Sequence, residues 1–182
     1  MNPDHGTAGP PIVKVVTVGA PPEQAFRRFT AEIASWWPLR THSVGEERSE
    51  TVIMEGFVGG RIVERIRGGE EAIWGMVTVW QPPLRVAFTW HPGEDRSTAQ
   101  DVDVRFTGVG DRTRVELTHS GFERLGARAA RMRRAYPIGW TYVLGLYSKR
   151  RGPMMWMLSG VTDALMAIQR RRAESARASL DR

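Results

Sequence analysis

The side chains of this sequence that could do acid–base chemistry or hold a metal ion are few and scattered. Its four histidines stand at positions 5, 42, 91 and 119, and it has no cysteine. A zinc site normally takes three or four nitrogen, sulfur or oxygen ligands in close array, which this spacing does not offer. The motifs of a serine nucleophile elbow, a dinucleotide-binding loop and a phosphate-binding loop are absent from the sequence. We therefore expect no metal, no cofactor and no catalytic residue set.

Two histidines nevertheless stand where they could serve a binding site. His119 shares strand parity with Val115 and Leu117, so its side chain is expected on an apolar face. It is either a core histidine with satisfied polar atoms or a polar anchor at the end of a cavity. His42 falls in the polar segment 40–43, which we expect to be a loop. It is either exposed to solvent or reaches the mouth of the same cavity.

Two glutamates in expected strands, Glu55 and Glu64, are the carboxylates considered as general bases. Burial near a cavity would raise the pKa of such a group and suit it to that role. Glu64, however, is flanked by Arg61, Arg65 and Arg67, a pattern typical of a solvated, ion-paired face. We therefore expect neither glutamate to be catalytic.

Tryptophan, of which the chain has seven, supplies a different chemistry, apolar contact and ring stacking. Neighbours at a helix end point about 100° apart, so we expect only one of Trp36 and Trp37 to be fully in the core. Trp90 shares parity with Leu84, Val86 and Phe88. A ligand pocket is mostly apolar and aromatic with a few polar anchors, although the same residues would also suit a filled core. The expected lining is Trp36, Trp37, His42, Trp74, Phe88, Trp90, His119, Trp140 and Leu144.

The elements that must position these residues follow from hydrophobic periodicity. Residues 12–18 are β-branched and predict a strand, and the prolines near residue 21 predict a helix start that follows it. From about residue 50 to 120 apolar and polar residues alternate between Gly and Pro turns, which indicates an antiparallel meander. After Gly121 the period becomes helical, with a short basic helix over 124–134 and a second helix that Pro137 opens.

This order predicts an α+β fold in which a curved antiparallel sheet wraps around a long C-terminal helix. We expect a disordered leader over residues 1–11, one domain over 12–150 and an additional C-terminal helix over 153–179. The leader has no signal-peptide pattern, so a cytoplasmic location is expected. The net charge of +6 is concentrated after residue 148, and the nearly neutral body argues against a nucleic-acid partner.

The additional helix carries an apolar stripe of methionine, leucine and valine followed by arginines at 170–172. Three alternatives fit it. It packs on the domain or on a second copy as a homodimer, it lies on a membrane surface with its arginines at the headgroups, or it is a basic tail for nucleic acid. We favour the packing alternative.

Several short signatures stand in one fixed order along the chain. They are Ala20-Pro21-Pro22-Glu23 with Phe26, Trp36-Trp37-Pro38, Gly59-Gly60-Arg61, Trp74-Gly75, Pro82-Pro83 with Leu84, Phe88 and Trp90, Thr118-His119-Ser120-Gly121-Phe122, and Gly139-Trp140 with Leu144. Together they resemble the SRPBCC, or START-like, superfamily, which has the helix-grip fold. The similarity covers about residues 12–149 and is strongest to the group related to the C-terminal domain of the activator of heat-shock-protein-90 ATPase.

The resemblance implies a container fold with many uses, among them lipid carriers, hormone receptors and polyketide cyclases. We expect the chain to lack the separate N-terminal domain of the eukaryotic co-chaperone, and it carries about 30 residues after Arg151 beyond the usual pattern. We expect a module that binds a small apolar or aromatic molecule rather than an enzyme. The alternatives are a cyclase- or dehydratase-type enzyme using the same cavity and a chaperone-accessory or stress-response interaction protein.

Overall fold

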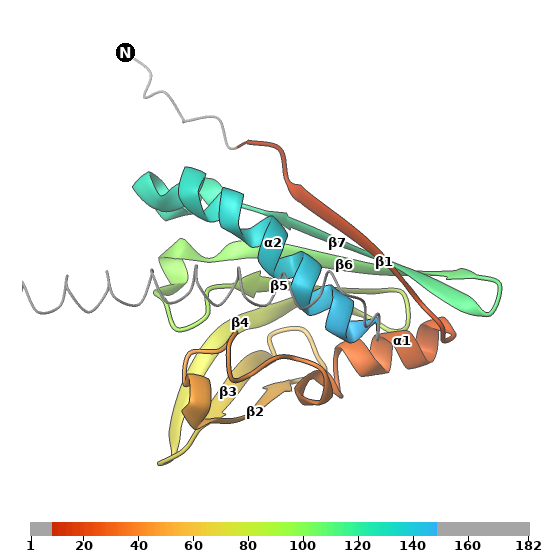
Figure 1. Cartoon of the computed structure of the whole chain (residues 1–182), viewed down its shortest axis with the longest axis horizontal. Coiled ribbons are helices and arrows are strands. Elements are labelled where there is room, and N and C mark those ends of the chain that lie inside the picture. The colour runs from red at the N-terminus through yellow and green to blue at the C-terminus, as the bar shows by residue number, and fades with distance from the viewer. Residues whose placement is uncertain (1–8, 149–182) are drawn as a thin grey trace, which may run out of the picture.

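The computed structural model describes residues 9–148 (Figure 1). Most of the expected leader and the expected helix over 153–179 lie outside the described residues. Within residues 9–148, no helix is long and apolar enough to cross a membrane. The elements in chain order are β1 (Ile12–Val18), α1 (Pro22–Phe29), η1 (Ile33–Ser35), η2 (Glu46–Arg48), β2 (Ser49–Met54), β3 (Arg61–Ile66), β4 (Glu70–Gln81), β5 (Arg85–Trp90), η3 (Arg96–Thr98), β6 (Gln100–Val109), β7 (Arg112–Ser120), η4 (Phe122–Arg128) and α2 (Ala129–Tyr147).

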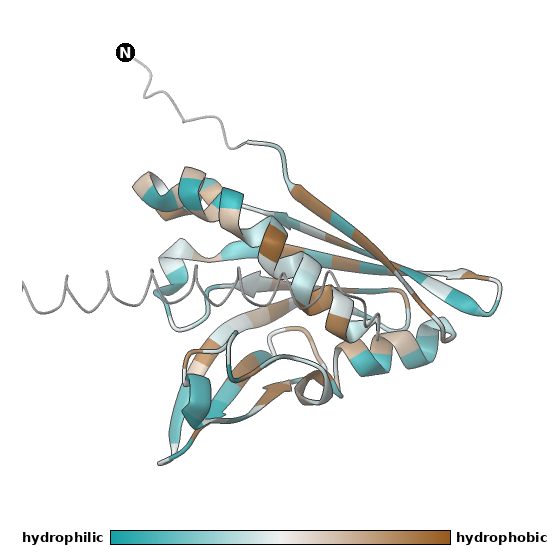
Figure 2. Cartoon of the chain, viewed as in Figure 1, coloured by the Kyte–Doolittle hydropathy of each residue, from teal (hydrophilic) through white to brown (hydrophobic). Residues whose placement is uncertain are grey.

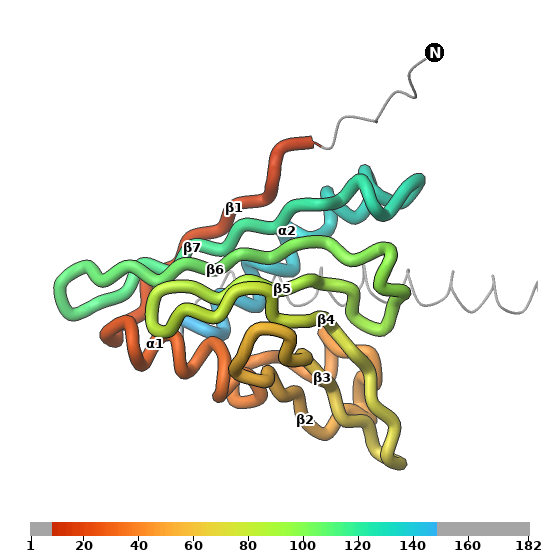
Figure 3. The backbone as a smooth tube through the Cα atoms, turned by 180° about the vertical axis from the view of Figure 1, so that it is seen from behind, coloured from red at the N-terminus to blue at the C-terminus, as the bar shows by residue number. Residues whose placement is uncertain are grey.

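The strands form one seven-stranded sheet in the order β1-β7-β6-β5-β4-β3-β2. Every neighbouring pair is antiparallel, and β1 pairs with the last strand, β7. The pairing register shifts between Ile62 and Val63 and again between Val77 and Val79. Such irregularities bend and twist a sheet, and β4 curves toward β3 and β2 where they occur (Figure 3). The predicted α+β class with a curved meander and a long helix is confirmed.

Helix α2 crosses the concave face of the sheet (Figure 1). Its end is tied to α1, because the Tyr147 hydroxyl donates a 2.7 Å hydrogen bond to the carbonyl oxygen of Ala25. Its middle is tied to β1 by a 2.8 Å hydrogen bond from Lys14 Nζ to Thr141 Oγ1. The helix therefore closes over the sheet with fixed contacts at both places.

Pro137 lies inside α2 and does not open it, so the predicted division into two helices was wrong. A proline removes one hydrogen bond and strains a helix interior by about 3 kcal/mol. The burial of Trp140, Val143 and Leu144 against the sheet offsets that cost, since each large apolar side chain contributes about 1.5–3 kcal/mol. The expected short basic helix over 124–134 is instead the turn η4 and the start of α2.

The alternation of the strands places the core as predicted (Figure 2). On β5 the side chains of Val86, Phe88 and Trp90 are buried on one face, and the corresponding faces of β6 and β7 are buried in the same way; Ala87, of the opposite parity, is buried as well. Leu84 is the exception. It was predicted on this face, but it lies in the turn before β5 and is 61% exposed, because the two-residue period begins only where strand pairing begins.

The backbone of β5 approaches Gly75 of β4 so closely that a side chain at this position would clash with it. A Cβ at Gly75 would lie 1.7 Å from the carbonyl oxygen of Thr89 in β5, whereas a Cβ at Gly139, inside α2, meets nothing within 4 Å. We expect Gly75→Ala to lower the free energy of unfolding by about 2 kcal/mol or more, because backbone must move. Gly139→Ala is the matched control, and it should raise that free energy by about 0.5–1 kcal/mol. Urea unfolding measures both, and equal stability of the two variants would contradict this packing.

Candidate functional site

The tryptophans form one aromatic cluster between the concave face of the sheet and α2. Trp37 is its centre, with ring centroids 5.1 Å from Trp74, 5.6 Å from Trp90 and 6.1 Å from Trp140. Trp90 also lies 5.9 Å from Phe88 and 5.7 Å from Trp140. These spacings are those of interacting aromatic pairs. All the predicted lining residues except His42 are buried: Trp36, Trp37, Trp74, Phe88, Trp90, His119, Trp140 and Leu144.

Trp36 and Trp37 are both buried, so the prediction that only one belongs to the core was wrong. They follow the short 3-10 turn η1 rather than an α-helix, and each ring finds its own place. Trp36 packs on Phe29 and Tyr147 and donates a 2.7 Å hydrogen bond to the Arg28 carbonyl. The Trp37 Nε1–H donates to the carbonyl of His42 at 2.6 Å.

His119 is fully buried on β7, and its Nδ1 accepts a 3.0 Å hydrogen bond from Nε1–H of Trp140. An indole nitrogen can only donate, so Nδ1 carries the lone pair. Burial lowers the pKa of His119 to about 3, which keeps the ring neutral with its proton on Nε2. This Nε2–H is buried and has no hydrogen-bond partner in the described part of the chain. The described protein residues therefore pair one of the two ring nitrogens of His119.

Further polar atoms at the same end of the sheet lack a hydrogen bond of standard geometry within residues 9–148. They are Oε1 of Gln100, Nε2 of His91 and Nε1 of Trp90, and the last of these has the Tyr136 hydroxyl as its neighbour. Trp90 and Gln100 are directly paired across β5 and β6, and Val102, two residues further, pairs with His119. The Gln100 amide nitrogen donates to the Thr98 carbonyl, which identifies the other atom as the oxygen.

Tyr136 of α2 covers this group. Its ring lies 4.5 Å from that of His119, nearly perpendicular to it. Burial raises the pKa of Tyr136 to about 12, against the opposing effect of the Trp90 indole N–H beside its hydroxyl, so the phenol stays protonated. Neither Tyr136 nor Gln100 was among the predicted lining residues. Gln100 was detectable, because it shares the parity of Val102 and Val104.

Glu64 is fully buried, so the prediction of a solvated, ion-paired side chain was wrong. Its carboxylate accepts three hydrogen bonds of 2.8 Å, from the backbone N–H groups of Val44 and Gly45 and from Trp74 Nε1–H. Those bonds fasten the segment that follows His42 to β3. Glu64 thus positions a loop and an indole.

Glu55 lies just beyond the end of β2 rather than within it. Its side chain accepts hydrogen bonds from the backbone and the guanidinium of Arg61, and these bonds lower the pKa of Glu55. His42 is half-buried, with its ring 5.1 Å from that of Tyr142 and its Nδ1 2.9 Å from Thr41 Oγ1. It therefore lies beside α2 at the edge of the aromatic cluster.

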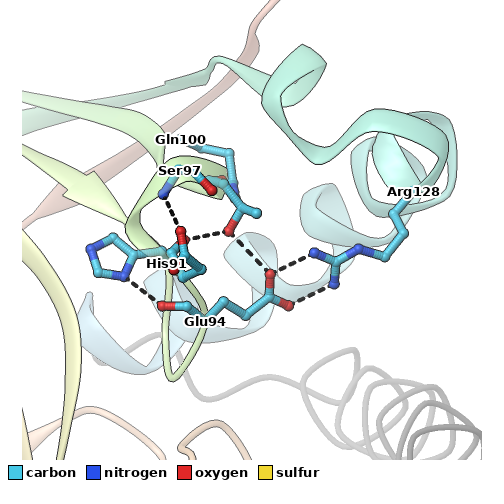
Figure 4. Close-up of polar contacts among 7 residues, drawn as sticks. His91, Glu94, Ser97, Gln100 and Arg128 are labelled. Carbon is cyan, nitrogen blue, oxygen red and sulfur yellow. Dashed lines mark hydrogen bonds and ion pairs between the residues drawn. The ribbon is translucent and has the colours of Figure 1, made fainter. Parts of the chain in front are cut away.

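The loop between β5 and β6 closes the end of the sheet at which Trp90 and Gln100 stand (Figure 4). Glu94 and Arg128 form a two-pronged ion pair with both distances at 2.7 Å. Arg128 lowers the pKa of Glu94. His91 Nδ1 lies 3.2 Å from the Glu94 carbonyl oxygen. The Glu94–Arg128 ion pair joins this loop to η4, so charged side chains lie outside the aromatic cluster at this end.

The described residues contain no group of three His, Cys, Asp or Glu side chains placed to hold a metal ion. What the interior offers chemically is large apolar ring surface, with polar atoms of Trp90, Gln100 and His119 at one end.

Residues 19–144 match the protein family described as activator of Hsp90 ATPase homolog 1-like protein. No curated protein sequence matches the chain. Among solved structures, an anthrahydroquino-gamma-pyrone synthase, Txn09, complexed with SUM, is 34% identical, covers 71% of this chain and 88% of its own, and gives a TM-score of 0.51.

Two other structures share the fold. The self-sacrificing resistance protein CalC from Micromonospora echinospora is 25% identical, with 78% of this chain and 93% of CalC covered and a TM-score of 0.57. An Aha1 dimer from Colwellia psychrerythraea is 17% identical, with 78% and 98% covered and a TM-score of 0.53. At that identity the Aha1 similarity supports the fold alone.

The buried neutral state of His119 has a consequence for stability. The unfolded chain takes up a proton at this residue below about pH 6.5, whereas the folded chain does so only near pH 3. Its contribution is therefore complete above about pH 6.5 and declines as the pH falls toward 3. We expect the loss of unfolding free energy between pH 7 and pH 5 to be smaller by about 2 kcal/mol in His119→Gln. Urea unfolding at both pH values tests this, and an equal loss in the variant and the original chain would contradict a neutral His119.

Proposed function

We propose that this chain, which belongs to the activator of Hsp90 ATPase homolog 1-like family of the SRPBCC superfamily, binds a small apolar or aromatic molecule. The molecule would lie between the concave face of the sheet and α2. The proposed lining is the predicted set, in which Trp37, Trp74, Trp90 and Trp140 supply ring surface. His119 and His42 would be the polar anchors.

The observation that carries this proposal is the concentration of indole rings in one interior cluster. The ring centroids of Trp74, Trp90 and Trp140 lie 5.1–6.1 Å from that of Trp37. Apolar surface of this kind gains about 25 cal/mol for each Å² removed from water. The rings contact one another, so an incoming aromatic molecule replaces ring–ring contacts by ring–ligand contacts of similar kind. This exchange favours planar aromatic ligands over compact aliphatic ones.

Likeness to two solved proteins supports the same proposal. One is the pyrone synthase complexed with SUM, and the other is the resistance protein CalC. The 34% identity to a synthase favours a second candidate, an enzyme that transforms its bound molecule in the same space. The chaperone-accessory alternative and a homodimer through residues 153–179 rest on the sequence, since that helix lies outside the described residues.

Native mass spectrometry of the purified full-length chain, with thermal-shift assays against planar two- and three-ring aromatics, tests the proposal. We expect either a co-purified organic molecule or a rise in melting temperature with such compounds. Trp37→Leu should weaken binding about tenfold or more, because it removes the central ring. The control is Trp80→Leu, a tryptophan of β4 outside the proposed lining.

Binding that Trp37→Leu and Trp80→Leu weaken equally would contradict the assigned location. A chain with no bound molecule and no thermal shift for any aromatic would contradict the proposal itself. A released compound whose mass differs from that of the compound added would identify the enzyme candidate, and an unchanged mass would identify a binding module.

A further inference from the structure

We propose that the interior site selects ligands that carry a carbonyl oxygen, such as a planar aromatic ketone or quinone. That oxygen would accept hydrogen bonds from Nε1–H of Trp90 and Nε2–H of His119. This inference rests on the proposed function and specifies which molecules the same site prefers.

The two donors are fixed by their surroundings. His119 cannot turn its Nε2–H elsewhere without breaking the 3.0 Å bond that its Nδ1 accepts from Trp140. Trp90 is packed between Phe88, Trp37, Trp74 and Trp140, with centroid distances of 5.6–5.9 Å. Both donors are therefore oriented before any ligand arrives, which lowers the entropic cost of binding.

The two donors also belong to one place in the interior. The rings of Trp90 and His119 both lie against Trp140, at 5.7 and 5.9 Å. Tyr136 links them further, because its ring contacts His119 and its hydroxyl faces the Trp90 indole N–H. A ligand oxygen in this place would lie between side chains of β5 and β7, beside Trp140 and Tyr136 of α2.

An unpartnered buried donor lowers stability, and nearly all such groups in proteins have a partner. Trp90 and His119 are 5% and 0% exposed. Nε2–H of His119 has no partner within residues 9–148, and Nε1–H of Trp90 makes no hydrogen bond of standard geometry there, its neighbouring acceptor being the Tyr136 hydroxyl. A ligand oxygen would pair the His119 donor and compete with the Tyr136 hydroxyl for the Trp90 donor.

The charge around the cluster favours a neutral carbonyl over a carboxylate. Both cations of η4 are already paired, Arg124 with Asp101 and Arg128 with Glu94. Burying an anion among aromatic rings without a cation is costly. Two neutral N–H donors match the partial charge of a ketone oxygen.

Fluorenone and fluorene test the inference, because they are planar three-ring compounds that differ only in a carbonyl against a methylene group. We expect the full-length chain to bind fluorenone about tenfold more tightly than fluorene, as two net hydrogen bonds would give. Trp90→Phe keeps an aromatic ring but removes one donor, and it should reduce this preference to about threefold. Trp80→Phe is the matched control and should keep the tenfold preference.

A second measurement needs no variant. The infrared carbonyl stretch of bound fluorenone should lie at lower wavenumber than in hexane, and Trp90→Phe should move it back toward the hexane value. Equal affinity for the two compounds, or a carbonyl stretch unchanged from hexane, overturns the inference and leaves the proposed function standing. If neither compound binds, nor any other planar aromatic, both fail.

Discussion

The hydrogen bond from the Trp140 indole to His119 Nδ1 joins the covering helix to the sheet, and much of the interior depends on it. It spans 3.0 Å between α2 and β7 in a region from which solvent is excluded. Because an indole can only donate, the bond also decides where the histidine proton resides. One contact therefore sets the position of the helix, the tautomer of the histidine and the direction of an unpaired donor.

The polar groups around the aromatic cluster have a shared effect, which is to hold indole rings in place from their edges. Trp36, Trp37 and Trp74 each donate to a protein acceptor, respectively the Arg28 carbonyl, the His42 carbonyl and the Glu64 carboxylate. Trp90 makes no such bond of standard geometry within residues 9–148. Its N–H has the Tyr136 hydroxyl as its neighbour, and the Tyr136 ring also contacts His119. Rings fixed at their edges present apolar faces inward. The N–H groups of Trp90 and His119 add polar donors to this apolar interior.

Much of this fold follows from local patterns, and most of the site does not. Residues 12–18 form the predicted strand, and the alternation along β5 to β7 places Trp90 and His119 on the concave face as predicted. Glu64 was missed because its neighbours are arginines, while its partners lie about twenty residues away at Val44 and Gly45. Pro137 was wrongly predicted to open a helix, because the burial of α2 against the sheet outweighs the low helix propensity of proline. Tautomers and unpaired atoms depend on three-dimensional contacts that no spacing encodes.

The most direct test of this account is the protonation of the His119 ring, measured by nitrogen-15 NMR of the full-length chain. The account predicts a neutral ring with its proton on Nε2 from about pH 8 down to about pH 4, because burial holds the pKa of His119 near 3. A proton on Nδ1, or titration near the ordinary value of about 6.5, would contradict it. Either result would mean that the Trp140 hydrogen bond does not fix the tautomer of His119 and that the interior lacks the Nε2–H donor of this histidine.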